Sequence, residues 1–103
     1  MPKFLFVYHG GSKPGTPEDV AAVMAKWGAW FEEMGATVVD GGNPVGLSKT
    51  VASDGVLDHG GANPASGYSI ISAGTIDDAV AKAKGCPVLE SGGSVELAEI
   101  IVM

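Results

Sequence analysis

Two segments of the chain carry the same start signal for an amphipathic helix, and each lies between segments typical of strands. Residues 16–35, "TPEDVAAVMAKWGAWFEEMG", begin with Thr16 as the N-cap and Pro17 at the first helical position, followed by acids that suit the positive end of the helix dipole. Residues 75–87, "TIDDAVAKAKGCP", repeat this pattern from Thr75. The chain therefore contains two predicted helices, each with a strand-like segment before it and after it.

The apolar segments around these helices predict strands. They are "KFLFVYH" at 3–9, "ATVVDGG" at 36–42, "YSIISA" at 68–73 and "SVELAEIIVM" at 94–103, and "GGSKPG" at 10–15 is a loop. Between the second and third of them, "SKTVASDGVLD" predicts an inserted β-hairpin that turns at Asp54-Gly55. The order β-α-β, hairpin, β-α-β predicts an α+β, ferredoxin-like (split βαβ) fold, with an antiparallel sheet and both helices on one face.

Both faces of the first strand are mainly apolar. Alternation divides its residues into two sets, Phe4, Phe6 and Tyr8 on one face and Leu5, Val7 and His9 on the other. Two helices cover only one face of a sheet, and a large apolar patch left in water is uncommon. We therefore expect a second copy of the chain to cover the other face, which gives a homodimer joined through the sheets.

Length and charge limit the function classes. We expect 103 residues to form a single domain, 1–103, and 46% hydrophobic with 17% charged residues indicates a compact chain. A net charge of −6 without a basic cluster disfavours a nucleic-acid partner. We expect a cytoplasmic protein without membrane association, because no segment approaches membrane-spanning length and no signal peptide is recognisable. No metal-ligand spacing is recognisable, so neither a metal nor a cofactor is predicted.

Three residues are candidates for catalysis. His9 ends the first strand before two glycines, and an imidazole with an ordinary pKa of about 6.5 is a general acid or base near neutral pH. Asp40 ends the second strand and would orient His9 if both lie at one rim of the sheet; the alternative is two independent solvated strand ends. Tyr68 is either a hydrogen-bond donor in a cavity between subunits or a buried strand tyrosine.

Other residues with reactive or aromatic side chains favour structural roles. Asp58 and His59 are adjacent, so in an extended chain they point to opposite faces, and a solvated loop is favoured. Trp27 and Trp30 lie on the apolar stripe of the first helix, which favours core packing over a ligand pocket. Cys86 follows the C-terminal end of a helix, where nothing lowers a thiol pKa, so a nucleophilic role is disfavoured.

Several segments together resemble the YCII-related family, and within it the DGPF branch. They are "KFLFVYHG", "PEDVAAVMAKWGAWFEEMGA", "GGNP", "GYSIISA", "DDAVAKAKGCP" and "GGSVELAEI", which span nearly the whole chain. The resemblance implies a dimeric α+β barrel of ferredoxin-like subunits. The chain departs from two family patterns. No histidine lies near Met24, where the helix histidine of shorter members falls, and "LDHGGANPASGY" matches only the acid of the four-residue motif, at Asp58.

Two functions follow from these expectations. The first is a cofactor-independent small-molecule enzyme for proton transfer or elimination, like the dehydrochlorinase-type relatives that the resemblance implies. Its site would lie in the dimer cavity, with His9, Asp40 and Tyr68 as the working residues. The second is a non-catalytic, dimeric ligand-binding or regulatory module, which the missing helix histidine favours.

Overall fold

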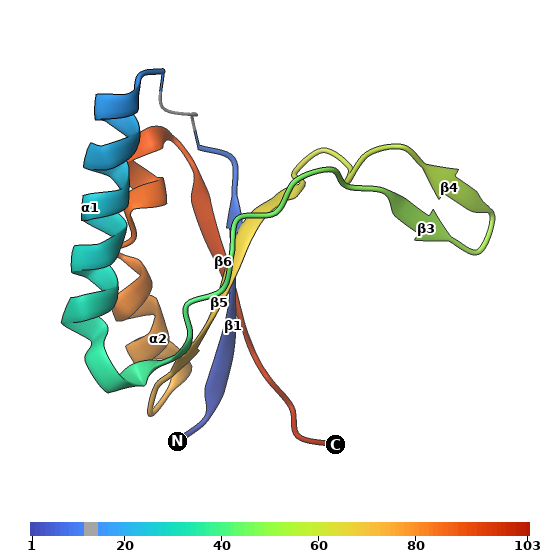
Figure 1. Cartoon of the computed structure of the whole chain (residues 1–103). Coiled ribbons are helices and arrows are strands. Elements are labelled where there is room, and N and C mark those ends of the chain that lie inside the picture. The colour runs from blue at the N-terminus through green and yellow to red at the C-terminus, as the bar shows by residue number, and fades with distance from the viewer. Residues whose placement is uncertain (12–14) are drawn as a thin grey trace.

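The computed structural model describes residues 1–11 and 15–103, so residues 12–14 of the predicted loop lie outside the described residues. The main sheet contains β1 (Lys3–His9), β2 (Val38–Asp40), β5 (Ala65–Ser72) and β6 (Ser94–Glu99), all antiparallel to their neighbours, in the order β2-β5-β1-β6. Helices α1 (Pro17–Met34) and α2 (Ile76–Ala83) both lie on one side of this sheet (Figure 1). The predicted α+β, ferredoxin-like fold is therefore confirmed.

The two helices begin where their caps predict. The side chain of Thr16 accepts a hydrogen bond from the Asp19 N–H at 3.1 Å, and Thr75 accepts one from the Asp78 N–H at 3.1 Å. Gly35, with a φ of +57°, ends α1 and opens the short 3-10 helix η1 (Gly35–Thr37). Within residues 1–11 and 15–103, no helix combines the length and apolar character that crossing a membrane requires.

Only the C-terminal half of α1 packs into the core. Trp30 and Met34 are buried there, whereas Val20 and Met24 near the start of the helix are 44% and 68% exposed. The apolar stripe predicted for α1 therefore extends beyond the part of the helix that packs on the core. On the sheet, Phe4 and Phe6 are fully buried.

Aromatic rings fill the space between α1 and the sheet. The Tyr8 and Trp27 rings pack edge to face with centroids 4.9 Å apart, and the Trp30 Nε1–H donates to the Lys82 carbonyl at 3.0 Å. The short 3-10 helix η2 (Pro87–Ser91) adds Val88 to this core. Both tryptophans therefore belong to the core and its margin, as their spacing predicts.

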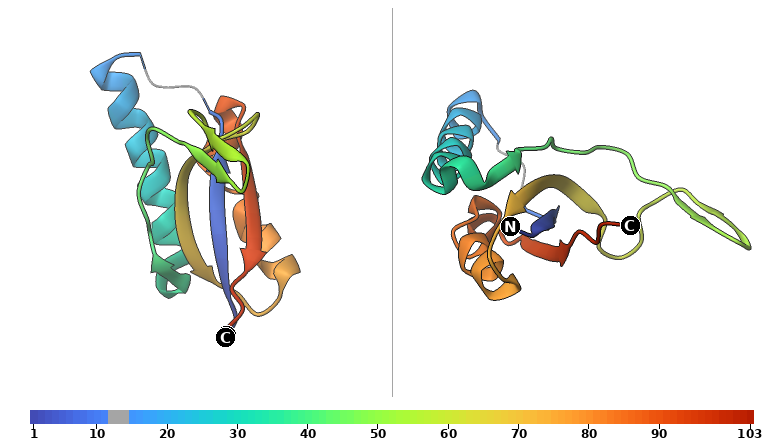
Figure 2. Two further views of the ribbon diagram at one scale, coloured as in Figure 1. Left: turned by 90° about the vertical axis from the view of Figure 1, so that its right-hand side faces the viewer. Right: turned by 90° about the horizontal axis from the view of Figure 1, so that it is seen from below.

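The predicted hairpin forms a separate two-stranded sheet. Strands β3 (Thr50–Ala52) and β4 (Gly55–Leu57) pair from Thr50 opposite Leu57 to Ala52 opposite Gly55. Ser53 and Asp54 therefore form the loop, one residue earlier than predicted. The hairpin projects from the side of the main sheet opposite the helices (Figures 1 and 2). We call the helix-free side of the main sheet the open face.

Candidate active site on the open face

Strand register brings three polar side chains together on the open face. Val7 pairs with Tyr68 of β5 on one side and with Glu96 of β6 on the other. Residues directly opposite each other share a face, and alternation along β1 puts His9 on the face of Val7. His9, Tyr68 and Glu96 therefore lie on one face. His9 is diagonal to Glu96, and on the β5 side a register shift between Tyr8 and His9 puts His9 opposite Ala65, three residues from Tyr68.

His9 is held by two acceptors. Its Nε2 lies 3.0 Å from Oε1 of Glu96, and its Nδ1 lies 3.3 Å from the Pro64 carbonyl oxygen. Because a protonated imidazole donates from both nitrogens, the charged form satisfies both contacts at once. The hydrogen bond to Glu96 therefore raises the pKa of His9 above its ordinary value, although desolvation acts in the opposite direction.

The two members of this pair differ in their access to solvent. His9 is only 8% exposed, whereas the side chain of Glu96 is 68% exposed. One carboxylate oxygen of Glu96 faces the imidazole, and among the described residues the other makes no hydrogen bond. The pair therefore presents a carboxylate oxygen to the open face and keeps a proton donor behind it.

Tyr68 is half-buried at the place where the chain leaves β2. Gly42, with a φ of +70°, packs so closely on Tyr68 that an added Cβ would overlap the Tyr68 carbonyl oxygen and come within 3.1 Å of its ring. Within the described part of the chain, the Tyr68 hydroxyl makes no hydrogen bond. It is thus placed as a donor on the same face as His9.

Asp40 does not meet His9. Asp40 pairs with Ile70 whereas His9 pairs with Ala65, so the two lie at different levels of the sheet, with β5 between their strands. The Asp40 carboxylate instead accepts a hydrogen bond from the Gly42 N–H at 2.8 Å and closes a turn. Of the two alternatives, the structure therefore has independent strand ends and no Asp40–His9 pair, and the carboxylate beside His9 belongs to Glu96.

The second acid–histidine pair stays apart from this site. Asp58 forms an exposed ion pair with Lys49 at 3.2 Å, and Nδ1 of His59 accepts from the Gly61 N–H at 2.9 Å. Across residues 1–11 and 15–103, no three His, Cys, Asp or Glu side chains are grouped so as to hold a metal ion.

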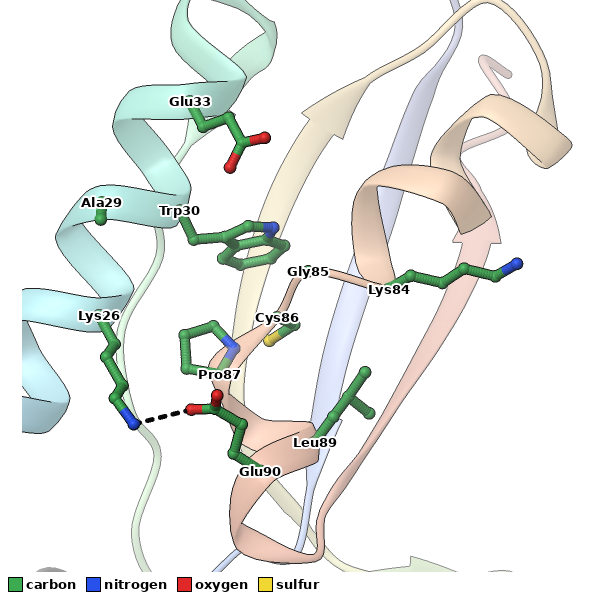
Figure 3. Close-up of a pocket in the computed structure, with 10 residues that line it drawn as sticks. All are labelled: Lys26, Ala29, Trp30, Glu33, Lys84, Gly85, Cys86, Pro87, Leu89 and Glu90. Atoms are coloured by element: carbon green, nitrogen blue, oxygen red, sulfur yellow. Dashed lines mark hydrogen bonds and ion pairs between the residues drawn. The ribbon is translucent and has the colours of Figure 1, made fainter.

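A cavity of about 410 Å³ lies on the helix side, between α1 and residues 84–90 (Figure 3). Trp30, Cys86 and Pro87 line it, and the ion pair between Lys26 and Glu90, at 3.0 Å, spans one end. Burial raises the pKa of the Cys86 thiol to about 11, so this thiol stays protonated near neutral pH. The cavity therefore offers no thiolate nucleophile near neutral pH.

Comparison with known proteins agrees with the fold. No protein-family model matches the chain, and no curated protein matches it in sequence. Among solved structures, it is similar to 5-chloro-2-hydroxyhydroquinone dehydrochlorinase from Burkholderia phenoliruptrix AC1100 in complex with 2,5-dihydroxybenzoquinone. The similarity has a TM-score of 0.55 at 18% identity and covers 96% of this chain and 95% of that one. At this identity the likeness shows a shared α+β fold.

Proposed function

We propose that the open face binds a small molecule and that the Glu96–His9 pair moves a proton to or from it, without a cofactor. The observation that carries this proposal is the 3.0 Å contact between a shielded imidazole and an exposed carboxylate, on a face that no helix covers. A pair of titratable groups in different environments is the usual basis of acid–base catalysis.

In this mechanism the free carboxylate oxygen of Glu96 takes a proton from the ligand. His9 stabilises the carboxylate before the transfer and fixes its orientation, and the Tyr68 hydroxyl donates to a ligand oxygen on which negative charge develops. In an elimination, the C–H electron pair forms the new double bond while the leaving group departs with its own bonding pair. Electrons balance, so the step needs no redox partner.

The proposed ligand is a hydroxylated aromatic ring or quinone. The structurally similar protein is a dehydrochlorinase, and its bound molecule is 2,5-dihydroxybenzoquinone. A flat ring of this kind suits a β-sheet surface with Leu5 and Val7 beside the polar groups. Tyr68 supplies the hydrogen-bond donor that a ring oxygen requires.

We further propose that the chain is a single domain of the YCII-related family, DGPF branch, and acts as a homodimer with the open faces turned inward. Support comes from the similar fold and from the apolar residues of the open face, of which Leu5 is 36% exposed. A second copy over this face removes it from water and turns the open surface into an enclosed site.

The test uses 2,5-dihydroxybenzoquinone as the probe. Its addition to the wild-type protein is expected to shift the imidazole NMR signals of His9 saturably and to leave those of His59 unchanged, with His59→Gln assigning the two. Proton transfer is followed as deuterium exchange into the ring C–H positions of the probe in D₂O. Glu96→Gln is expected to slow the protein-dependent exchange by about 100-fold, the usual loss when a general base is removed.

Glu99→Gln is the matched control, because Glu99 is an exposed acid on the same strand and makes no contact with His9. Saturable binding without protein-dependent exchange would instead identify a ligand-binding module without catalysis. If His9 does not respond to the probe, the open face is not a site for this ligand class.

A further inference from the structure

The hairpin lacks support from its own chain. We call residues 46–63 the arm; within the described strands, β3 and β4 pair only with each other. Figures 1 and 2 show the arm reaching away from the helices and the main sheet. The Cα radius of gyration is 14.8 Å, above the value of about 13 Å expected for a compact chain of this length. A two-stranded hairpin alone is marginally stable in water, so the arm requires a surface to pack on.

The end of the arm is apolar. Val51 and Val56 are cross-strand partners and are 78% and 60% exposed, and Leu57 is 52% exposed. The 18 residues of the arm contain one lysine and two aspartates, whereas the whole chain has six more acids than bases. Two copies of an acidic chain therefore meet little charge repulsion through this part of the surface.

The base of the arm is tightly built. An added Cβ on Gly60 would come within 2.8 Å of Pro64 and 3.0 Å of Ser48. Glycine is therefore needed where these two segments of the arm's base approach each other. The Thr50 hydroxyl donates to the His59 carbonyl at 2.8 Å, and Lys49 pairs with Asp58. These contacts hold the two segments of the arm against each other, so the shape of the hairpin is pre-organised for a partner.

We infer that the arm is a clasp that packs on the body of a second copy of this chain. This inference rests on the sheet-to-sheet dimer of the proposed function. The arm leaves the side of the sheet on which that second copy would sit, and its eight residues from Gly46 to Ser53 span about 25 Å when extended. Since facing sheets pack about 10 Å apart, an arm of this length passes the partner's sheet and contacts the partner beyond it.

The first test is a shortened arm. Replacing residues 51–56 with Asn-Gly keeps the Thr50–Leu57 pair and the contacts at the base while removing the apolar tip. Sedimentation equilibrium is expected to show a dimer Kd at least tenfold weaker than that of the wild type. Val20→Glu is the control, because Val20 is an exposed valine on α1, on the opposite side of the molecule, and its replacement is expected to leave Kd unchanged.

The second test detects contact between copies. A spin label on Val51→Cys in unlabelled protein, mixed with ¹⁵N-labelled wild type, is expected to broaden amide signals of the partner outside residues 46–63. The native Cys86 is 2% exposed and leaves the label specific for position 51.

The outcomes separate the clasp from the proposed function. A wild-type dimer whose Kd is unchanged by the shortened arm, with no broadening between copies, overturns the clasp and leaves the sheet-to-sheet dimer standing. A monomeric wild type overturns the clasp and the dimer together. The response of His9 to the quinone probe is measured independently and decides the proposed site.

Discussion

At the residue scale, the protonation of His9 depends on Glu96. The imidazolium donates to Glu96 and to the Pro64 carbonyl, so its pKa in the folded protein is raised. Glu96→Gln removes the charged acceptor and is expected to lower the pKa of His9 toward about 6.5, its ordinary value. An NMR titration of the His9 ring signals measures this change. An unchanged pKa in Glu96→Gln would show that Glu96 does not control His9.

The same contact makes stability depend on pH. A raised folded-state pKa means that protonation stabilises the fold, so the stabilisation is complete below about pH 6.5 and is lost as pH rises through the folded pKa. Because Glu96 is exposed, we expect a contribution of about 0.5 kcal/mol. Urea unfolding of the wild type and Glu96→Gln at pH 5.5 and pH 9 measures it. Equal differences between the two proteins at both pH values would contradict the linkage.

Gly42 fixes the position of Tyr68. Gly42→Ala forces a left-handed backbone on alanine and drives its Cβ into the Tyr68 carbonyl, so we expect a loss of about 2 kcal/mol or more in the free energy of unfolding. Gly41→Ala is the matched control, since no atom lies within 4 Å of an added Cβ there. Urea unfolding compares the two variants. Equal stability of both would rule out the close approach between residue 42 and Tyr68.

At the element scale, the caps decide where the helices begin. Thr16→Ala removes the hydrogen bond to the Asp19 N–H and is expected to cost about 1 kcal/mol of unfolding free energy, whereas Thr16→Ser keeps the hydroxyl and most of the stability. Denaturant unfolding followed by circular dichroism measures both. If serine and alanine destabilise equally, the hydroxyl is not the source of the cap energy.

Where a boundary depends on local chemistry it was predictable, whereas β2, β5 and β6 have other bounds than the predicted 36–42, 68–73 and 94–103. The bounds of β1 and the start of α1 follow from alternation and from the Thr16-Pro17 signal alone. The identity of the carboxylate beside His9 depends instead on which strand pairs with β1. Glu96 alternates with Val95 and Leu97, a pattern that favours the polar face of a strand, but local sequence does not reveal that this strand lies beside His9.

At the scale of the whole molecule, the two sides of the sheet differ in what they offer a partner. The helix side is closed by an aromatic core, and its cavity holds a protonated thiol and a crossing ion pair. The open side carries the His9–Glu96 pair, the apolar residues of β1 and the arm. The polar groups of the candidate site and the apolar surface available for dimerisation thus lie on the same side of the sheet. We therefore expect dimer formation and ligand binding to depend on each other.

This dependence predicts the behaviour of Leu5. Leu5→Glu places a charge on the open face while the monomer keeps its core, because Leu5 is 36% exposed. If the open faces meet in a dimer, two glutamates are buried near one another and the variant is expected to be monomeric in sedimentation equilibrium at micromolar concentration. Val23→Glu, at 38% exposure on α1, is the control and should remain dimeric. A dimeric Leu5→Glu would show that association uses another surface; a monomeric one that also binds the quinone probe more weakly would tie the ligand site to the second copy.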